Sequence, residues 1–506
     1  MTPGTVRTAV ALRVAFAIVP GVAALIGAWP ILRNDFYADD YLHLFELASF
    51  GPREFVVSPH GGHMLLVSNA VFHLSYLAFG MWPGGYLALA LGTHVVTSLL
   101  VGAVARRLTG NALVACVAAV LFAVSPASHG TVGWYSVYGH VLATMATLLA
   151  LLIVVPRPGE DDPPLSPPAA LSAAGLLLVA SQCFGTGAAL ALVFPVVAVL
   201  LRPATLREGA SRAVLAVVPL LVLLAWAVIT GRRTRLNPAG FESTVGMVGL
   251  AADHRHVGGV AAHLFGMGVE GLLLGATFPL ADHGNALSLV TLAVFLVAVS
   301  GALLLGSGRV RRRLAACLLA AATCYLVVAA GRGAMYVHFT QDHLLSALAA
   351  ATRYHYLAQA LLALVVALAL DELGRHLPWR RVGEVLLGAW IAWALASTVL
   401  LPRPARLGEA ERAAVTRARR RIEEAIRARP PGATVCLAVE PVARLIGVPG
   451  SLGVYVMYHP TDEFEGRRVR FVSSDSKLLA LREAGGRIQR LLLPAGECPP
   501  RDGGRG

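Results

Sequence analysis

Residues 33–43 read RNDFYADDYLH and directly follow the first apolar segment of the chain. The adjacent carboxylates Asp39 and Asp40 therefore stand where a membrane-spanning helix would meet water. Carboxylates are costly at that depth unless they face a cavity or take part in chemistry, so the pair marks a candidate site. The structural alternative is a solvated loop or the N-cap of a helix over residues 41–49.

The composition is that of a membrane protein. The 506 residues are 56% hydrophobic with a mean hydropathy of +0.67, which is more apolar than an ordinary soluble domain. The net charge of +13 comes almost wholly from arginine, because Lys477 is the only lysine. Arginine in short loops orients a membrane protein, so this charge does not predict nucleic-acid binding.

Apolar runs near the roughly 20 residues needed to cross a bilayer predict about eleven transmembrane helices. They lie at residues 10–30, 84–105, 111–127, 136–155, 169–182, 186–201, 212–230, 285–306, 314–330, 353–371 and 382–401. Two further stretches, 63–80 and 258–278, are interrupted by polar residues, and we expect interfacial helices with one wet side. The first run is too long for a cleavable signal, so we expect it to be retained.

The arginines predict the orientation. If the two interfacial helices do not cross the membrane, the arginine-rich loops after residues 105, 201, 306 and 371 lie on the same side of the membrane as the N-terminus. The positive-inside rule makes that side cytoplasmic, here that of a bacterial cytoplasmic membrane. The acidic loop and the C-terminal tail then lie outside the cytoplasm. Arg232 and Arg233 fall in an outer loop, where they either weaken this topology or hold an anionic group.

The tail differs from the rest of the chain. We expect a transmembrane domain over residues 1–401 and a small extracytoplasmic α/β domain over 402–506. Cys436 and Cys498 are the only cysteines of the tail, and they form either a disulfide or two free thiols. The predicted elements of the tail are strands at 434–439, 469–473 and 487–493, and helices at 407–428 and 477–483.

Several short sequence motifs follow the acidic pair in a characteristic order. They are an interfacial segment Leu74–Gly85 followed by Tyr86–His94, a turn Ala105–Gly110, the run Val120–Pro126 with His129 and Trp134, and the phrase Thr352-Arg353-Tyr354-His355-Tyr356. This order resembles the GT-C superfamily of polyprenyl-phosphate-sugar-dependent glycosyltransferases, most of all the bacterial relatives of the protein O-mannosyltransferases and the TMTC-type O-mannosyltransferases. The resemblance covers roughly residues 10–401 and leaves out the tail.

The resemblance implies an inverting membrane glycosyltransferase that acts at the extracytoplasmic face. It would move a sugar from a polyprenyl-phosphate donor to a hydroxyl of a glycan, lipid or protein. Asp39 would be the general base, with Asp40 supporting it, or the pair would bind Mg²⁺ or Mn²⁺. The residues expected to contact substrate are Arg353 and Tyr354, with His63, His129, Trp134, Arg232 and Arg233.

The chain also departs from the family pattern. The turn at 181–186 lacks the lysine that many relatives carry, Thr352 replaces a glutamate, and Leu87 replaces a histidine. Two alternatives therefore stay open. One is a catalytically inactive membrane scaffold, and the other is a lipid or polysaccharide transporter, which should show an internal repeat with paired broken helices.

For the remaining histidine and aromatic side chains we expect structural roles. We expect His94 to pack within a span with a hydrogen bond to a neighbouring helix. Trp134, Tyr135 and Tyr138 are expected in the aromatic belt of the membrane interface. The histidine spacing predicts no zinc site.

Overall fold

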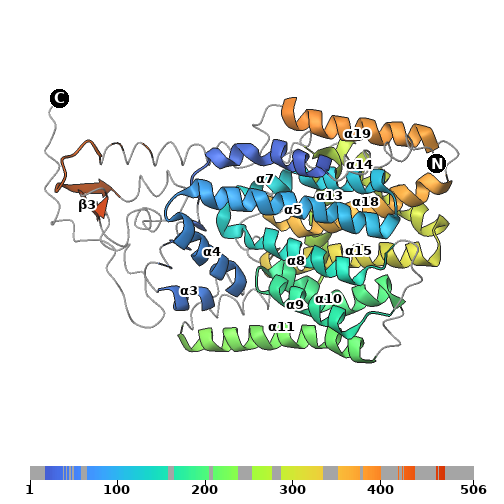
Figure 1. Cartoon of the computed structure of the whole chain (residues 1–506), viewed down its shortest axis with the longest axis horizontal. Coiled ribbons are helices and arrows are strands. Elements are labelled where there is room, and N and C mark those ends of the chain that lie inside the picture. The colour runs from blue at the N-terminus through green and yellow to red at the C-terminus, as the bar shows by residue number, and fades with distance from the viewer. Residues whose placement is uncertain are drawn as a thin grey trace, which may run out of the picture.

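The computed structural model describes most of the membrane part and a little of the tail. The described residues are 18–37, 39–40, 43–44, 47, 51–58, 65–157, 164–203, 209–236, 254–275, 286–333, 351–376, 380–400, 420, 424, 427–438, 463–464 and 467–472. Their helices form a bundle whose length runs horizontally in Figure 1.

Within these ranges, six helices are long and apolar enough to cross a membrane. They are α5 (Pro83–Thr109), η2 (Tyr135–Val137) with α8 (Gly139–Val154), most of α13 (His254–Leu274), α14 (Ala286–Leu305), α15 (Gly308–Val328) and α18 (Tyr356–His376). Large apolar side chains on α14, such as Val297 at 72% and Leu304 at 76% exposure, face outward. A surface of this kind suits contact with lipid. The chain is therefore an α-helical membrane protein.

The remaining helices frame the bundle or cap its ends. They are η1 (Trp29–Arg33), α3 (Pro52–Val57), α4 (Leu66–Phe79), α6 (Ala112–Ala123), α7 (Pro126–Val132), α9 (Pro167–Ser181), α10 (Gly185–Leu201), α11 (Gly209–Leu236), the π-helical η5 (Ala329–Gly333), η6 (Thr352–Tyr354) and α19 (Arg380–Leu400).

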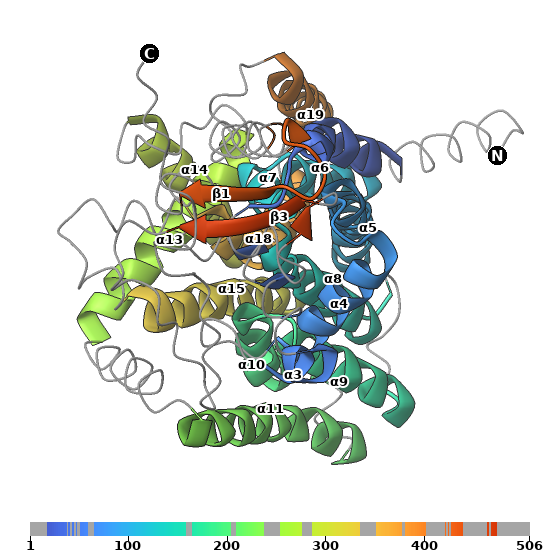
Figure 2. The ribbon, with the colours of Figure 1, turned by 90° about the vertical axis from the view of Figure 1, so that its left-hand side faces the viewer.

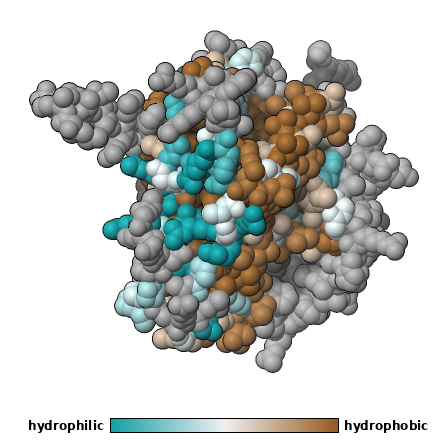
Figure 3. Space-filling model, turned by 90° about the vertical axis from the view of Figure 1, so that its right-hand side faces the viewer, coloured by the Kyte–Doolittle hydropathy of each residue, from teal (hydrophilic) through white to brown (hydrophobic). Residues whose placement is uncertain are grey.

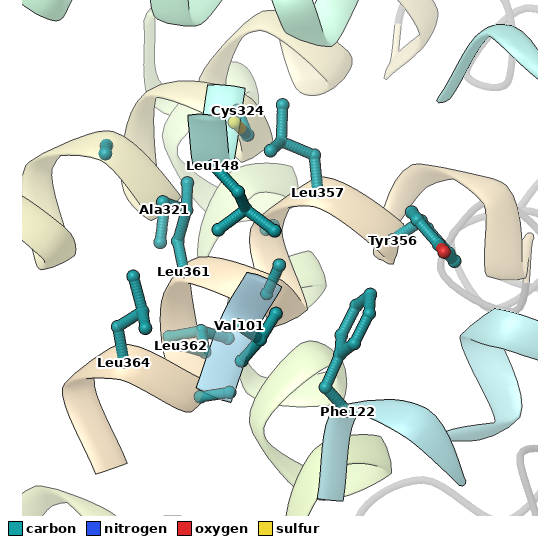
Figure 4. Close-up of a cluster of buried hydrophobic side chains, with 14 of the residues drawn as sticks. Val101, Phe122, Leu148, Ala321, Cys324, Tyr356, Leu357, Leu361, Leu362 and Leu364 are labelled. Carbon is teal, nitrogen blue, oxygen red and sulfur yellow. The ribbon is translucent and has the colours of Figure 1, made fainter. Parts of the chain in front are cut away.

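Helix α18 lies at the centre of the core. All its residues from Tyr356 to Ala369 are buried, and it contacts α5, α6, α8, α14 and α15. Figure 4 shows how Phe122 of α6 and Leu148 of α8 approach it from different sides. A helix that is apolar on every side is stable only when other helices, or lipid, surround it completely. Here the other helices surround α18.

One end of the bundle is lined by arginines that bond to helix ends. Arg313 Nη1 donates to Leu108 O at 2.6 Å, and Arg375 Nη2 donates to Thr109 O at 3.3 Å. Arg107 Nη1 donates to Val155 O at 3.2 Å. These carbonyls lie in the last turn of α5 or directly after α8. Backbone carbonyls at a helix C-terminus have no N–H donor within the helix, so the arginines supply one. We call this end the arginine end. Figure 3 shows it from outside, and hydrophilic side chains gather there beside a hydrophobic surface.

Some predicted spans are shorter in the structure. The predicted span 111–127 is broken between α6 and α7 at Val124 and Ser125, because the residue before Pro126 is disfavoured in a helix. The 12 residues of α6 cover only about 18 Å. Helices α9 and α10 also stay below the length of a full span, so the count of eleven remains a prediction. Helix α11, by contrast, continues to Leu236, six residues past the expected end at 230.

The expectation of a wet polar face on 63–80 is wrong for α4. Its buried Asn69 donates to Phe55 O at 3.0 Å and to Ser58 O at 2.8 Å. Its outward side chains are instead apolar, with Leu74 62% and Leu77 67% exposed. The polar residues that interrupt this stretch therefore hold α3 and α4 together, and the apolar ones face outward.

Helix α13 was expected to lie at the interface, yet by length and composition it could span a membrane. Its Gly268 O accepts a hydrogen bond from Gln359 Nε2 at 2.9 Å, at the first turn of α18. Its Phe265 ring contacts Phe295 of α14 and Tyr325 near the end of α15. Gln359 lies in the first turn of α18 and Tyr325 in the last turn of α15. Helix α13 therefore contacts both helices at their ends opposite the arginine end.

The described part of the tail contains a three-stranded sheet in the order β1-β3-β2. Strand β1 (Thr434–Ala438) pairs in parallel with β3 (Arg467–Val472), and β2 (Glu463–Phe464) pairs antiparallel with β3. The sheet lies at the end of the bundle that faces the viewer in Figure 2. Strands β1 and β3 coincide with two predicted strands, and β2 was not predicted. The segments 477–483 and 487–493, most of the predicted helix 407–428, and the side chains of Cys436 and Cys498 lie outside the described residues.

Candidate functional site

The acidic pair lies in the first turn of a helix that begins earlier than predicted. Asp40 N donates to Tyr37 O at 3.0 Å, and Tyr37 N donates to Asp40 Oδ2 at 2.9 Å. This reciprocal arrangement resembles a capping box, in which an acidic residue three positions into the helix reaches back to the cap. Asp40 therefore caps the helix from within its first turn, and not as the N-cap of a helix over residues 41–49.

Asp40 also ties this turn to a distant part of the chain. Its carboxylate, only 2% exposed, accepts a second hydrogen bond from Ser136 N of η2. Burial raises the pKa of Asp40 from 3.8 to about 7, and the charge of Asp39 acts in the same direction, while the two backbone donors lower it. Asp39 itself is half-buried. Of the two, Asp39 is therefore the carboxylate that a substrate can reach.

The raised pKa of Asp40 predicts a pH-dependent stability. Between about pH 4 and about pH 7 the folded protein holds a proton on Asp40 that the unfolded chain releases, so stability falls as pH rises through this window. Replacing Asp40 with asparagine removes this titration. We expect Tm measured in detergent to fall less between about pH 5 and about pH 8 in Asp40→Asn than in the wild type.

A matched control for this experiment is Glu54→Gln, which removes an exposed acid on α3 and should keep the wild-type pH response. An Asp40→Asn protein with an unchanged pH response would contradict the burial argument. At about pH 5 the variant is also expected to be less stable, because an amide cannot accept from both N–H donors, which leaves one of them unpaired at a cost of about 1–3 kcal/mol.

The segment 134–138 joins the acidic turn to two helices. Tyr135 Oη hydrogen-bonds Ser75 of α4 at 2.6 Å, and Tyr138 Oη hydrogen-bonds Thr93 of α5 at 2.6 Å. Both tyrosines are buried, so the expectation that they belong to an interfacial aromatic belt is wrong. Their hydroxyls find partners inside the protein, as buried tyrosine hydroxyls usually do.

Trp134 and Arg353, both half-buried, belong to the same junction. The Arg353 guanidinium carbon lies 5.0 Å from the Trp134 ring centre and 4.6 Å from that of Tyr354. Trp134 also meets the ring of Tyr37 edge-to-face, with centroids 5.4 Å apart. Since Tyr37 N bonds Asp40, the arginine and the acidic pair belong to one contiguous cluster. We call Tyr37, Asp39, Asp40, Trp134 and Arg353 the junction cluster.

The junction cluster lies at the end opposite the arginines. Arg353 belongs to η6, directly before α18, and Arg375 at the other end of α18 contacts the arginine end. The 21 residues of α18 separate the two by about 30 Å. Asp39 and Arg353 therefore lie at the same end of the molecule.

A glycine in α7 allows η6 to approach. A Cβ atom on Gly130 would stand 1.7 Å from Thr352 Oγ1 and 2.7 Å from Thr352 Cβ. No side chain fits at that distance, so any substitution must displace either α7 or the Thr352-Arg353 turn. Gly130 therefore helps to set the position of Arg353.

Replacing Gly130 with alanine is expected to destabilise the protein by about 1–3 kcal/mol through this overlap. The fall in Tm would measure it. Gly92→Ala in α5 is the control, because a Cβ there meets nothing within 4 Å. Adding Thr352→Gly to Gly130→Ala should restore much of the loss, and a double variant as unstable as the single one would contradict the overlap.

Histidines close to the cluster are held inside the bundle. The buried His140 stacks against Phe184 with ring centres 3.6 Å apart and meets the Tyr354 ring at 6.4 Å. His355 Nδ1 hydrogen-bonds Tyr325 Oη at 3.1 Å. His94 bonds Tyr356 Oη at 2.7 Å and Ala123 O at 3.1 Å, which agrees with the expected packing role.

No protein-family model matches this chain, and no curated protein sequence matches it either.

The other predicted contact residues are not all placed. His63 lies outside the described residues, and His129 lies on α7 with a side chain that is not described. Arg232 and Arg233 lie near the end of α11, not in a loop, and their side chains are likewise not described.

The described residues do not form a carboxylate cage for Mg²⁺ or Mn²⁺. Within them, no group of three or more histidine, cysteine, aspartate or glutamate side chains could hold a metal ion. Both oxygens of Asp40 accept backbone N–H groups, which leaves Asp39 as the one accessible carboxylate of the pair.

Sequence reasoning missed the partners that hold the cluster together. Tyr37 and Ser136 make the decisive contacts, and Gly130 provides the space beside Thr352. The signals in the sequence were weak. One was the high density of aromatic residues in 134–138, and the other was a glycine inside a short helix.

Proposed function

We propose that this chain is a membrane glycosyltransferase that moves a sugar from a polyprenyl-phosphate donor to an acceptor hydroxyl at the extracytoplasmic face. The observation that supports it best is the junction cluster, in which a partly exposed carboxylate and a partly exposed guanidinium share one end of a membrane bundle. The resemblance to the GT-C superfamily points to the same chemistry.

Arg353 is suited to the donor phosphate. The guanidinium carbon lies over the rings of Trp134 and Tyr354, and Nη2 donates to Tyr354 Oη at 3.3 Å, so the other N–H donors remain for a second partner. Stacking also restricts the side chain, so less entropy is lost when an anion binds. The cluster lies at the end of the bundle, where a lipid-linked phosphate would stand while its chain remains among apolar helices.

Asp39 is suited to the acceptor. In an inverting transfer, the acceptor oxygen forms a bond to the anomeric carbon while the bond from that carbon to the phosphate oxygen breaks. The acceptor proton passes to Asp39, and the electron pair of the broken bond stays on the polyprenyl phosphate beside Arg353. Asp40 is a positioning residue, since its oxygens fix the turn that presents Asp39.

The direct test uses the full chain in membrane vesicles with radiolabelled polyprenyl-phosphate hexoses. The proposal expects label to move from the lipid to a non-lipid or second-lipid product, with release of polyprenyl phosphate. Absence of turnover with every donor, together with intact folding, would favour the membrane scaffold.

The extracytoplasmic placement, the eleven spans, and the tail as a separate α/β domain belong to the same proposal. The proposed orientation of the protein follows from the arginine end, because positive charge in short loops stays in the cytoplasm.

This orientation can be tested with single cysteines introduced next to Asp39 and next to Arg313, by measuring whether each reacts with a membrane-impermeant thiol reagent. The Asp39 position should react in intact cells, and the Arg313 position should react only after lysis.

A further inference from the structure

Tyr354 directly follows Arg353 in η6, but the two side chains differ in exposure. Arg353 is half-buried, whereas Tyr354 is only 4% exposed. The resemblance implied that both residues contact substrate. A ring that is almost fully buried offers little surface to a bound lipid, so we expect any effect of Tyr354 on a ligand to pass through neighbouring side chains.

Tyr354 holds the guanidinium of Arg353 in two ways. Its hydroxyl oxygen accepts a hydrogen bond from Arg353 Nη2 at 3.3 Å, and the guanidinium carbon lies 4.6 Å from the centre of its ring. The Trp134 ring centre lies 5.0 Å from the same carbon. A long side chain that is held at its face and at one N–H group keeps few rotamers. The remaining N–H donors of Arg353 therefore have a defined direction.

The bundle fixes the Tyr354 ring from the side of α8 and α10. The buried His140, in the first turn of α8, meets this ring edge-to-face with centroids 6.4 Å apart. His140 stacks on Phe184 at 3.6 Å, and its Nδ1 hydrogen-bonds Thr186 Oγ1 at 3.4 Å. Both of these residues lie at the start of α10. The position of Tyr354 is therefore set by helices outside its own segment.

The residue after Tyr354 fixes η6 from another side. His355 is 4% exposed, and its Nδ1 hydrogen-bonds Tyr325 Oη of α15 at 3.1 Å. Gly268 of α13 leaves the space for this pair, because a Cβ there would overlap Tyr325 Oη and stand 3.3 Å from His355 Nδ1. Since η6 is held from both sides, Tyr354 gives Arg353 a firm support.

We propose that Tyr354 is a positioning residue, which holds the Arg353 guanidinium for the donor phosphate and does not contact the donor itself. This inference rests on the proposed function, which assigns the phosphate to Arg353. Its physical basis is preorganisation, because a guanidinium that is already held loses less entropy when the phosphate binds. Without the Tyr354 hydroxyl the guanidinium adopts more rotamers, and phosphate affinity falls although no direct contact is lost.

The test measures binding of a short-chain polyprenyl monophosphate to the purified full-length protein in detergent by isothermal titration calorimetry. Tyr354→Phe removes the hydroxyl and keeps the ring. We expect Kd to rise about three- to fivefold, the size expected for one net hydrogen bond. Tm checks that the variant is folded. An unchanged Kd in the folded variant would overturn the proposal, and so would absence of binding in the wild type.

Tyr86→Phe is the matched control. It also removes a buried tyrosine hydroxyl at this end of the bundle, one that donates to Gly80 O at 2.7 Å and not to the η6 segment. We expect its Kd to stay within about twofold of the wild type. An equal rise in both variants would indicate general loosening of this end and would overturn the specific role of Tyr354.

A double-variant cycle separates positioning from direct contact. Tyr354→Phe is also made in Arg353→Gln, which lacks the guanidinium. If Tyr354 acts through Arg353, this second substitution should change Kd by less than about 1.5-fold. Equal fold-rises in the two backgrounds would show that Tyr354 meets the ligand independently of Arg353, which would overturn the proposal.

The proposed function has a separate readout, the transfer of labelled sugar. A protein that transfers no sugar but shows the coupled rise in Kd would lose the transferase assignment and keep the positioning role. A protein that transfers sugar but shows no such rise would keep the assignment and lose the positioning role.

Discussion

Replacing Asp39 with asparagine is expected to lower sugar transfer at least about 100-fold while donor binding changes little. Asparagine has nearly the same shape but cannot take the proton of the acceptor hydroxyl. Asp39 is half-buried, so the change should also leave the fold intact. Initial rates of label transfer from the polyprenyl-phosphate donor, with Tm as a check on folding, measure the effect.

Asp35→Asn is the matched control for this variant. Asp35 lies four residues before Asp39, and its Oδ1 accepts Phe36 N at 2.7 Å, a bond that an asparagine oxygen can keep. We expect this variant to retain most of the activity. Full activity of Asp39→Asn would end its assignment as the base, and similar losses in both variants would indicate damage to the turn and not to the chemistry.

The second large effect is expected at Arg353. In Arg353→Lys the charge remains, but the planar guanidinium that contacts Trp134 and Tyr354 is lost. We expect KM for the donor to rise about tenfold or more, with a further loss in kcat because the leaving phosphate is less well stabilised. Donor titrations at fixed acceptor separate the two parameters.

Arg33→Lys is the control for Arg353→Lys. Arg33 also stacks on a tryptophan, with its guanidinium carbon 4.7 Å from the Trp29 ring centre, but it is not part of the junction cluster. The same substitution at this position should leave donor KM within about twofold of the wild type. An unchanged KM in Arg353→Lys would remove the arginine from phosphate binding.

Hydropathy and arginine placement predicted much of the architecture. The run 353–371 became α18, and the arginine loops after 105, 306 and 371 meet at one end of the bundle. Both patterns are local, because apolar length and loop charge are set by consecutive residues. The break before Pro126 was also readable in principle, but a long apolar window concealed it.

The contacts that build the site could not be read in the same way. Asp40 and Ser136 are 96 residues apart, and Ser75 and Tyr135 are 60 apart. Nothing local distinguishes a buried tyrosine with a distant partner from an interfacial one, so Tyr135 and Tyr138 were misplaced. The sequence could place Asp39 and Arg353 on the same side, but it could not show that Trp134 and Tyr37 connect them.

The enclosure of residues Tyr356 to Ala369 of α18 affects how the protein is made. This helix is synthesised late, after α5, α6, α8, α14 and α15, yet it occupies the middle of all of them. Until residues 356–376 are synthesised, the earlier helices therefore lack every contact that α18 makes with them in the folded protein. A ribosome that stalls before that point leaves an assembly without its centre, so quality-control proteases should degrade such shortened chains rapidly.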